Sequence, residues 1–336
     1  MSSLMPLASQ PGSIYLLAAV SFLISLGAVR SIEVRWGSQL LDVPNERSSH
    51  KQPTPRGGGL GFVVAFAIAS AVFALVDRAA APIFWHLWTV LLPLSVVGIL
   101  DDRGNVPAGA RYLVQLSAAG LAVYWFGAFP QPWLSAWGSI GTAIAWVLTA
   151  IGFTALVNFY NFMDGLDGLV AGSTALQLGF LATATEEPLW GLLVASLLGF
   201  LVRNWSPAKI FMGDVGSTVL GACVAIALLN VSEPAPAWTL LAVTLPLVGD
   251  AVYTLARRLL RGENIFQAHR THLYQRLQQS GWSHASVAAT YLALTATAAL
   301  AIAALGSTGG WLCLGGEAIA LSIGEGYLRS RQQVPA

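Results

Sequence analysis

The sequence predicts an all-α integral membrane protein, a polytopic bundle of about eleven transmembrane helices in a single domain over residues 1–336. Hydrophobic residues make up 55% of the chain and charged residues 10%, whereas a soluble domain carries about 25% charged residues. The apolar residues form long stretches, and a helix of roughly 20 such residues crosses a ~30 Å hydrocarbon core. Lys and Arg are distributed unequally between the connections, which indicates an orientation for the bundle.

Eleven apolar stretches account for most of the chain. They lie near residues 13–30, 59–77, 82–100, 111–128, 138–157, 168–183, 188–203, 215–231, 237–256, 286–305 and 308–324. The sixth and seventh are short, but a single tilted helix in their place would bury both Glu186 and Glu187, which is costly in a bilayer. We therefore expect two spans there.

The connections between the predicted spans carry very unequal charge. If the first span runs inward, sixteen Lys and Arg residues lie on one side of the membrane and Arg78 alone lies on the other. Because Lys and Arg are retained on the cytoplasmic side, we expect an outside N-terminus and a cytoplasmic C-terminus. The net charge of +1 and the scatter of basic residues over several loops give no indication of nucleic-acid binding.

The distinctive polar segments all fall in predicted cytoplasmic loops, the first of which spans residues 41–59. This loop combines basic side chains with Gly57, Gly58 and Gly59. Three successive glycines permit backbone amides to approach an anion closely, and basic residues supply positive charge for a phosphate. The basic residues are Arg47, Lys51 and Arg56. The alternative is a flexible basic loop that obeys the positive-inside rule.

Two adjacent carboxylates, Asp101 and Asp102, directly follow the third predicted span. Adjacent carboxylates at a helix end repel one another unless a cation lies beside them, which favours a divalent metal site or a raised pKa. A solvated loop is the alternative.

The most distinctive polar segment runs from residue 158 to residue 169. It holds two asparagines, two aspartates and two glycines at short intervals, namely Asn158, Asn161, Asp164, Gly165, Asp167 and Gly168. Asn and Asp oxygens suit Mg²⁺, which prefers oxygen ligands and keeps some waters and substrate phosphates. Solubility alone does not require this composition in a turn, so we predict a metal and phosphate site.

A further turn, residues 211–217, begins the eighth predicted span. Asp214 is a candidate metal ligand there, because free amides at a helix N-terminus can face an anion while the carboxylate binds the metal. Ser217 is also suited to capping that helix. Phe211 stands where its ring can stack on a flat base, and packing in the bilayer interface is the alternative.

The last predicted cytoplasmic loop is the longest and contains His269, Arg270 and His272. The spacing of three would place both histidines on one face of a helix, which suits zinc, but no Cys accompanies them. The Arg and Tyr residues among them better suit a lid that binds phosphate and hydroxyl groups. Asp250, about two turns below the surface in the ninth span, is expected to be functional or paired, as intramembrane carboxylates usually are.

Together these segments resemble the polyprenyl-phosphate N-acetylhexosamine-1-phosphate transferase family, of the glycosyltransferase family 4 type, which initiates peptidoglycan, O-antigen and teichoic-acid lipid intermediates. The resemblance covers five motifs in order, between residues 42 and 277. They are Pro44-Asn-x-Arg-Ser-Ser-His50 with Pro53-Thr-Pro-Arg-Gly-Gly-Gly59, Asp101-Asp102, Asn158-x-x-Asn161-x-x-Asp164-Gly-x-Asp167-Gly-Leu169, Phe211-Met-Gly-Asp214-x-Gly-Ser217, and the terminal histidine loop.

The resemblance implies that a membrane polyprenyl phosphate, such as undecaprenyl phosphate, attacks the β-phosphate of a UDP-N-acetylhexosamine to give polyprenyl-diphospho-sugar and UMP. It implies catalytic roles for Asp101, Asp102, Asp164, Asp167 and Asp214. It implies Mg²⁺, with Mn²⁺ as an alternative, held by Asp214, Asp101 and Asn158. Substrate binding is implied for Asn45, Arg47, His50, Lys51, Arg56, Asn158, Asn161, Gly165, Leu166, Phe211, His269, Arg270 and His272, with Phe211 stacked on uracil.

One departure narrows the expected donor. Related enzymes that use common N-acetylglucosamine or muramyl-peptide donors carry additional histidines in the last loop, where this chain has His272-Leu-Tyr274-Gln275. The pattern resembles the O-antigen subgroup that handles 6-deoxy amino sugars, and a UDP-N-acetylglucosamine donor is the alternative. The resemblance also implies a bacterial inner membrane with the active site at the cytoplasmic face, and it leaves a homodimer open.

Two other classes of membrane protein share some of these features. A CDP-alcohol phosphotransferase is the nearest enzymatic rival, because Asp164-Gly-Leu-Asp167-Gly168 satisfies the beginning of its motif, but the rest of that motif does not follow. A cation-coupled transporter concentrates polar residues near the bilayer midplane. This chain concentrates them at one predicted surface, so we expect an enzyme.

Overall fold

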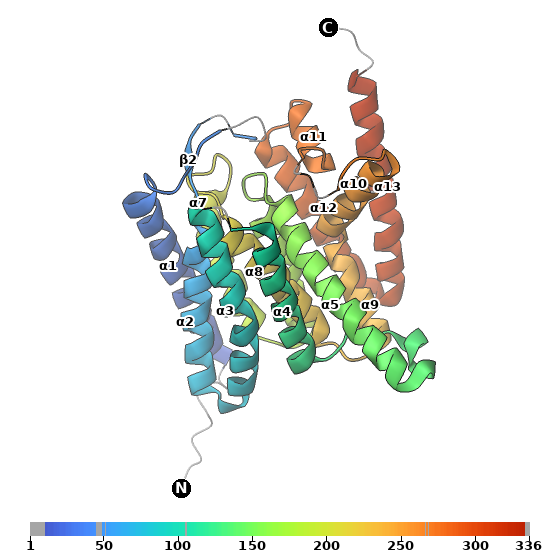
Figure 1. Ribbon diagram of the computed structural model, residues 1–336. Coiled ribbons are helices and arrows are strands. Elements are labelled where there is room, and N and C mark those ends of the chain that lie inside the picture. The colour runs from blue at the N-terminus through green and yellow to red at the C-terminus, as the bar shows by residue number, and fades with distance from the viewer. Residues whose placement is uncertain are drawn as a thin grey trace.

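The structure is a computed structural model that describes residues 11–44, 49–50, 52–104, 106–265, 267 and 269–332. Long helices that run mostly along one axis dominate it (Figure 1). In chain order they are α1 (Pro11–Trp36), α2 (Gly59–Val76), α3 (Ala81–Arg103), α4 (Ala108–Phe126), α5 (Gly138–Met163), α6 (Leu169–Ala184), α7 (Leu189–Asn204), α8 (Asp214–Leu229), α9 (Pro234–Leu241), α10 (Leu245–Leu260), α11 (Leu273–Gln279), α12 (His284–Leu305) and α13 (Ser307–Gln332).

Short elements join some of these helices. They are the 3₁₀ turns η2 (Arg78–Ala80), η3 (Pro132–Trp137) and η4 (Ala242–Thr244), and the strands β1 (Leu41–Asp42) and β2 (Thr54–Pro55). The two strands pair antiparallel, with Leu41 opposite Pro55. This pair was not predicted, but it ties the two ends of the first polar loop together.

A helix covers every one of the eleven predicted apolar stretches, and α9, η4 and α10 share the ninth. Within the described residues, six helical segments are long and apolar enough to cross a membrane, namely Ser13–Trp36, Gly59–Val76, Arg78–Arg103, Pro132–Met163, Pro234–Leu260 and His284–Leu305. The prediction of an all-α integral membrane protein is consistent with this. The number of crossings and the sides on which the termini lie stay predictions.

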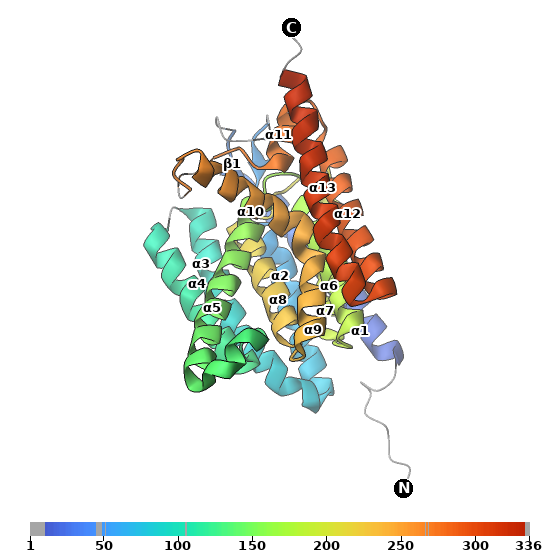
Figure 2. The same cartoon turned by 90° about the vertical axis from the view of Figure 1, so that its right-hand side faces the viewer.

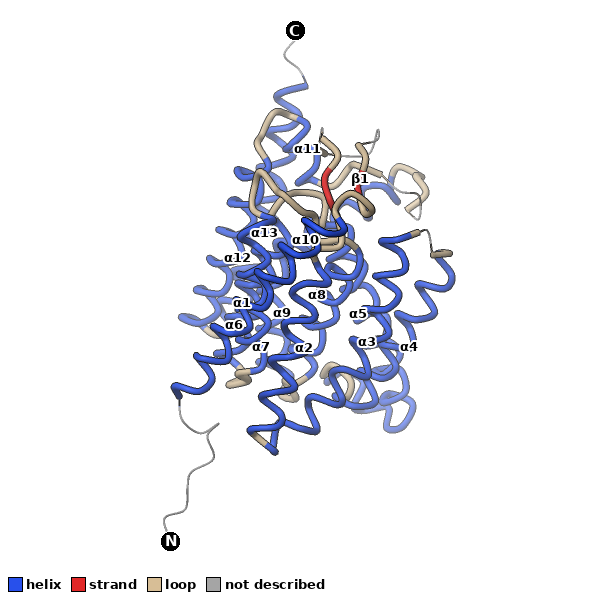
Figure 3. The backbone as a smooth tube through the Cα atoms, turned by 90° about the vertical axis from the view of Figure 1, so that its left-hand side faces the viewer, coloured by secondary structure: helices blue, strands red, loops and turns tan. Residues whose placement is uncertain are grey.

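The two ends of the bundle differ in character. β1 and α11 lie at one end, called here the site end, and α13 finishes there, whereas α1 begins at the opposite end (Figures 2 and 3). The polar loops predicted to be cytoplasmic are therefore gathered at the site end.

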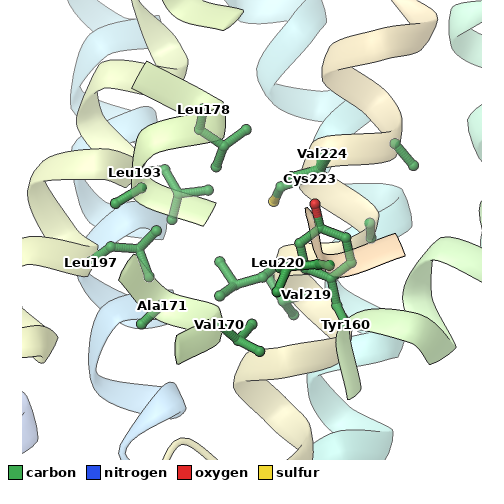
Figure 4. Packing of buried hydrophobic residues seen from close by; sticks show 14 of the residues in the cluster. Tyr160, Val170, Ala171, Leu178, Leu193, Leu197, Val219, Leu220, Cys223 and Val224 are labelled. Carbon is green, nitrogen blue, oxygen red and sulfur yellow. The ribbon is translucent and has the colours of Figure 1, made fainter. Parts of the chain in front are cut away.

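Helix α8 is the centre of the bundle. Every residue from Val215 to Leu229 is buried, and α8 contacts α2, α3, α5 and α6. Figure 4 shows Leu220 and Cys223 of α8 among Leu178 of α6 and Tyr160 of α5. A helix that is apolar all round is stable only when it is buried in this way. Asp214, the first residue of α8, is consequently attached to the best-packed element of the protein.

The N-terminus of α8 is fixed by a close helix approach. A methyl group added at Gly59 of α2 would lie 2.6 Å from the Cα of Gly216, and small residues permit such approaches between membrane helices. The amides of Gly58 and Gly59 donate to the carbonyl oxygens of Phe211 (2.9 Å) and Met212 (2.8 Å). The expectation that these glycine amides face an anion is therefore wrong, because they attach α2 to the turn before α8.

Candidate active site

Two cavities open at the site end. The first, called here the polar cavity, has a volume of about 310 Å³. All five polar loops contribute to its wall, with Asp42, Ser49, His50 and Arg56 from the first, Asp102 from the second, Asn161, Asp164, Gly165, Leu166 and Asp167 from the third, Asn204, Phe211, Met212, Gly213 and Asp214 from the fourth, and Gln275 and His284 from the last. The predicted convergence of these distant segments is confirmed.

The second cavity, called here the apolar cavity, has a volume of about 570 Å³ and lies among α3, α4, α5 and the segment after α10. Its apolar wall includes Leu94, Val97, Tyr112, Val114, Ala155, Phe159, Leu255 and Ile265, and its polar residues include Asp101, Arg111, Gln115, Asn158, His269 and His272. Asn161 and Asp214 line both cavities. These two side chains form the junction between a polar and an apolar compartment.

Asp102 holds the start of α8. Its Oδ1 accepts the amide N–H of Asp214 (2.9 Å) and its Oδ2 accepts that of Val215 (3.3 Å). A carboxylate at this place satisfies amides that have no partner within the helix and complements the helix dipole. The expectation that these amides are free for a substrate anion is wrong, because the protein's own carboxylate occupies them. Ser217 does not cap the helix, since its hydroxyl donates back to the carbonyl of Gly213 (3.3 Å).

Asp101 turns towards the apolar cavity instead. Its Oδ1 accepts the amide of Val106 (2.9 Å), and its Oδ2 accepts Nη1 of Arg111 (2.5 Å). The same Arg111 nitrogen lies 3.6 Å from Oδ2 of Asp214. The cation that two adjacent carboxylates require is therefore supplied in part by Arg111, which the sequence predicts only as one of the basic residues of the cytoplasmic loops.

Asp164 faces the polar cavity in a strongly negative environment. Burial, and then the charges of Asp214, Asp102 and Asp167, raise the pKa of Asp164 to about 8. Burial also acts to raise the pKa of Asp167, but the hydrogen bond and charge of His284 (3.1 Å from Nδ1 to Oδ1) outweigh it and hold that pKa below its usual range. The negative charge around Asp164 is thus only partly compensated by the protein.

This donor set fits magnesium bound together with a phosphate ligand. Within the described residues, no group of three or more His, Cys, Asp or Glu side chains could hold a metal ion by itself. Mg²⁺, however, is usually held by one or two carboxylates, with waters and substrate phosphates completing its coordination. Asp164 and Asp214 offer oxygen ligands on one wall, and the raised pKa of Asp164 indicates a place where a cation would be favoured.

Asn158 and Asn161 have separate environments. Asn158 lines the apolar cavity and donates to Oε1 of Gln115 (2.8 Å) and to the carbonyl of Thr154 (2.8 Å). Asn161, one helical turn later, donates to Oδ1 of Asp214 (3.0 Å). The asparagine that touches the candidate metal ligand is therefore Asn161, and Asn158 lies away from the polar cavity.

The first loop contributes two of its predicted residues to the polar cavity, beside Phe211. The rings of His50 and Phe211 meet edge to face with centroids 4.8 Å apart. Arg56 donates through Nη2 to the carbonyl of Asp102 (2.6 Å). The other predicted residues of this loop, Asn45, Arg47 and Lys51, lie outside the described residues.

The last loop places His269 and His272 on the wall of the apolar cavity. Their ring centroids are 4.9 Å apart. Helix α11 begins only at Leu273, so the expectation that both histidines share a helix face is wrong. Burial, followed by the charges of His272 and Arg258, lowers the pKa of His269 to about 4. Arg270 is on neither of the two cavity walls.

Comparison with known proteins agrees with this geometry. The profile of Glycosyl transferase family 4 matches residues 84–232, which contain the second, third and fourth polar loops. A probable undecaprenyl-phosphate N-acetylglucosaminyl 1-phosphate transferase of Bacillus subtilis is 31% identical over 299 residues, a match that covers 83% of this chain and 80% of the relative. The chain belongs to glycosyl transferase family 4.

Two further relatives extend the comparison. A decaprenyl-phosphate N-acetylglucosaminephosphotransferase of Mycolicibacterium smegmatis is 30% identical over 312 residues, covering 80% of this chain and 75% of the relative. A phospho-N-acetylmuramoyl-pentapeptide-transferase of Listeria welshimeri is 27% identical over 311 residues, covering 83% of this chain and 94% of the relative. The resemblance to polyprenyl-phosphate N-acetylhexosamine-1-phosphate transferases, inferred from the five motifs, is confirmed.

Some cavity residues of this family 4 chain were not predicted from the sequence. Arg111 and His284 are examples, since both line a cavity and neither belongs to an aspartate or glycine motif. The available signal was their position, because each is a polar or basic residue close to a predicted span boundary and to a motif. That signal is weak, since basic residues are expected at such boundaries for topological reasons alone.

Proposed function

We propose that this protein transfers N-acetylhexosamine 1-phosphate from a UDP-sugar to a membrane polyprenyl phosphate and releases UMP. The observation that carries the proposal is the junction at Asp214 and Asn161, where a carboxylate-lined cavity meets an apolar one. A reaction between a water-soluble nucleotide sugar and a lipid phosphate requires such a meeting point. The named relatives support the assignment, since they are transferases of undecaprenyl and decaprenyl phosphate.

The polar cavity suits the donor. In the proposal the uracil stacks on Phe211, beside His50 and next to the backbone of Gly165 and Leu166. Stacking on an aromatic ring holds a base without requiring a particular hydrogen-bond pattern. The diphosphate then extends towards Asp164 and Asp214, where bound Mg²⁺ would neutralise phosphoryl charge as a Lewis acid.

The apolar cavity suits the acceptor. The prenyl chain packs along residues such as Val97, Val114 and Phe159. Its phosphate lies at Arg111, whose side chain is 40% exposed and whose Nη1 is 3.6 Å from Oδ2 of Asp214. Arginine binds phosphate with charge-assisted hydrogen bonds, so this residue would hold the acceptor phosphate beside the junction.

The chemistry is then a direct displacement. An oxygen of the lipid phosphate forms a bond to the β-phosphorus, and the bond from that phosphorus to the bridging oxygen breaks, so UMP leaves with the electron pair. A phosphate monoester with a second pKa of about 6 is already largely ionised near neutrality, so little proton abstraction is required. The main task of the protein is to position two mutually repelling anions and stabilise their charge. In this scheme Asp101 acts through Arg111, whose guanidinium it orients.

The identity of the sugar is a narrower proposal. The sequence His272-Leu-Tyr274-Gln275 favours a 6-deoxy amino sugar and O-antigen synthesis, whereas the relatives are named for N-acetylglucosamine and N-acetylmuramoyl-pentapeptide. Tyr274 is fully buried and donates to the carbonyl of Phe162 (2.9 Å), so it is not offered to a sugar. Gln275 lines the polar cavity, and the proposal assigns the selection of the sugar to that wall.

The test is UMP release by the purified protein with Mg²⁺, undecaprenyl phosphate and a panel of UDP-N-acetylglucosamine and UDP-6-deoxy-N-acetylhexosamines. We expect release with at least one donor, and a loss of about 10²- to 10³-fold in kcat for Asp214→Asn, the magnitude typical of removing a key electrostatic group. Glu187→Gln, a change before α7 in a residue that lines neither cavity, is the matched control and should keep full activity. Release of CMP from a CDP-alcohol in place of UMP would contradict the proposal.

A further inference from the structure

Asp250 is a buried carboxylate that the proposed chemistry does not use. It lies on α10 with 0% of its surface exposed and on neither of the two cavity walls. Its hydrogen-bond donors are the amides of Leu273 (2.8 Å) and Tyr274 (3.0 Å) and the hydroxyls of Tyr291 (2.7 Å) and Thr254 (3.0 Å), and Nδ1 of His272 lies 3.7 Å away. A carboxylate can accept all of these donors because its two oxygens offer about four lone-pair sites.

These donors come from two helices besides α10 itself. Leu273 and Tyr274 are the first residues of α11, Tyr291 lies on α12, and His272 immediately precedes α11. A buried carboxylate is costly unless its partners satisfy it, and a helix of seven residues is not stable alone. Asp250 therefore holds the beginning of α11 at a fixed depth in the bundle.

The start of α11 contributes residues to both cavities, so its position affects both. His272 lines the apolar cavity and Gln275 lines the polar cavity. Between them Tyr274 donates to the carbonyl of Phe162 and abuts Gly165, where an added methyl group would collide with its hydroxyl. The loop that carries Asp164 is thus packed directly against the helix that Asp250 anchors.

The ring of His272 lies close to Asp250, and His272 lines the apolar cavity. Its Nδ1 is 3.7 Å from Oδ1 of Asp250, which is longer than a hydrogen bond. Asp250 therefore positions His272 mainly through the amides of the next two residues, Leu273 and Tyr274, which its carboxylate accepts.

We propose that Asp250 is a positioning residue for the transfer reaction, which holds His272 towards the acceptor phosphate and α11 against the loop of Asp164. The proposal rests on the proposed function, because transfer is one of its readouts. Asp250 itself touches no substrate in this scheme. Its effect on the acceptor passes through His272.

The first experiment is a double-mutant cycle with Asp250→Asn and His272→Asn. Asn at position 250 keeps the shape but turns one acceptor into a donor, and Asn at position 272 can still precede a helix. We expect Asp250→Asn to lower kcat for transfer by about 10- to 100-fold, as loss of an orienting partner does, with the KM for the UDP-sugar changed less than about twofold. The double variant should lose about as much as His272→Asn alone, because residues that act as a unit are not additive.

A second measurement does not depend on activity. Hydrogen exchange of residues 273–279 should be faster in Asp250→Asn than in the unchanged protein, and unchanged in the matched control Glu187→Gln. Unaltered transfer and exchange in Asp250→Asn, or losses in the cycle that simply multiply, would overturn the proposal. If the unchanged protein releases no UMP, the proposed function fails, while the exchange result still decides whether Asp250 positions α11.

Discussion

The polar and apolar cavities differ in size, in lining and in origin. The polar cavity is built from the five loops at the site end, and five aspartates line it. The larger apolar cavity is built mainly from the sides of α3, α4 and α5. Loops supply the charged ligands and helix faces supply the apolar wall, so each compartment has the chemistry of only one proposed substrate.

The two cavities share the lining residues Asp214 and Asn161. Asp214 is anchored at the start of the buried helix α8, and Asp102 accepts its amide. The site where the two substrates would react is therefore attached to a helix whose residues from Val215 to Leu229 are all buried. We therefore expect a substitution on one side of the junction to change the KM of only one of the two substrates.

The largest one-sided effect is expected on the acceptor side. Arg111→Ala removes the cation beside Asp101 and Asp214, and hydrogen bonds to charged groups contribute about 1.5–3 kcal/mol. We expect the KM for polyprenyl phosphate to rise roughly 10- to 100-fold, with the KM for the UDP-sugar nearly unchanged. Arg111→Lys, which keeps the charge, should recover part of the loss in steady-state assays. An equal rise in both KM values would show that the two compartments are not distinct.

A smaller effect is expected on the donor side. Phe211→Ala removes the ring that lies beside His50 in the polar cavity, and stacking of a base on an aromatic residue is worth about 1–3 kcal/mol. The KM for the UDP-sugar should rise about tenfold and the KM for the lipid should stay the same. Phe211→Tyr is the matched control, since it keeps the ring. A larger change for the lipid than for the nucleotide would place the donor elsewhere.

The smallest predicted effect is the change in apparent Mg²⁺ affinity of the polar cavity for each pH unit. The pKa of Asp164 is raised to about 8 in the metal-free protein, so its carboxyl is protonated below that pH. Because a metal binds the ionised form and displaces the proton, the apparent Mg²⁺ affinity should fall by up to about tenfold per pH unit below 8 and level off above it. Calorimetric titration at several pH values measures this. Asp164→Asn should flatten the profile between pH 7 and 8, whereas Asp214, whose pKa burial raises to about 7, still titrates below that range. A flat profile in the unchanged protein would contradict the account.

Much of the architecture was predictable because apolar stretches of bilayer length have few alternatives to helices. Asp101, Asp164, Asp167 and Asp214 could be grouped from the distribution of basic residues, which puts their loops on one side. Hydrogen-bond partners could not be predicted, because Asp102 bonds an amide 112 positions later. A local sequence pattern does not show which backbone amides already donate to a carboxylate elsewhere in the chain.

The same limitation explains the specific errors. Gly58 and Gly59 have the composition of an anion site, but close packing against the turn before α8 uses their amides. Asn158 and Asn161 lie one turn apart in the sequence motif, yet only Asn161 reaches Asp214. Arg111 was missed because a basic residue at the end of a span is expected for reasons of topology.

The central claim, that the two cavities hold the two substrates and meet at Asp214, is tested most directly by site-specific photocrosslinking. A benzophenone amino acid is placed at Phe159 in the apolar cavity or at His50 in the polar cavity, and each variant is irradiated with radiolabelled undecaprenyl phosphate or UDP-N-acetylhexosamine. The account predicts that position 159 captures the lipid and position 50 captures the nucleotide sugar. Capture of the lipid at position 50 and of the nucleotide sugar at position 159 would contradict it.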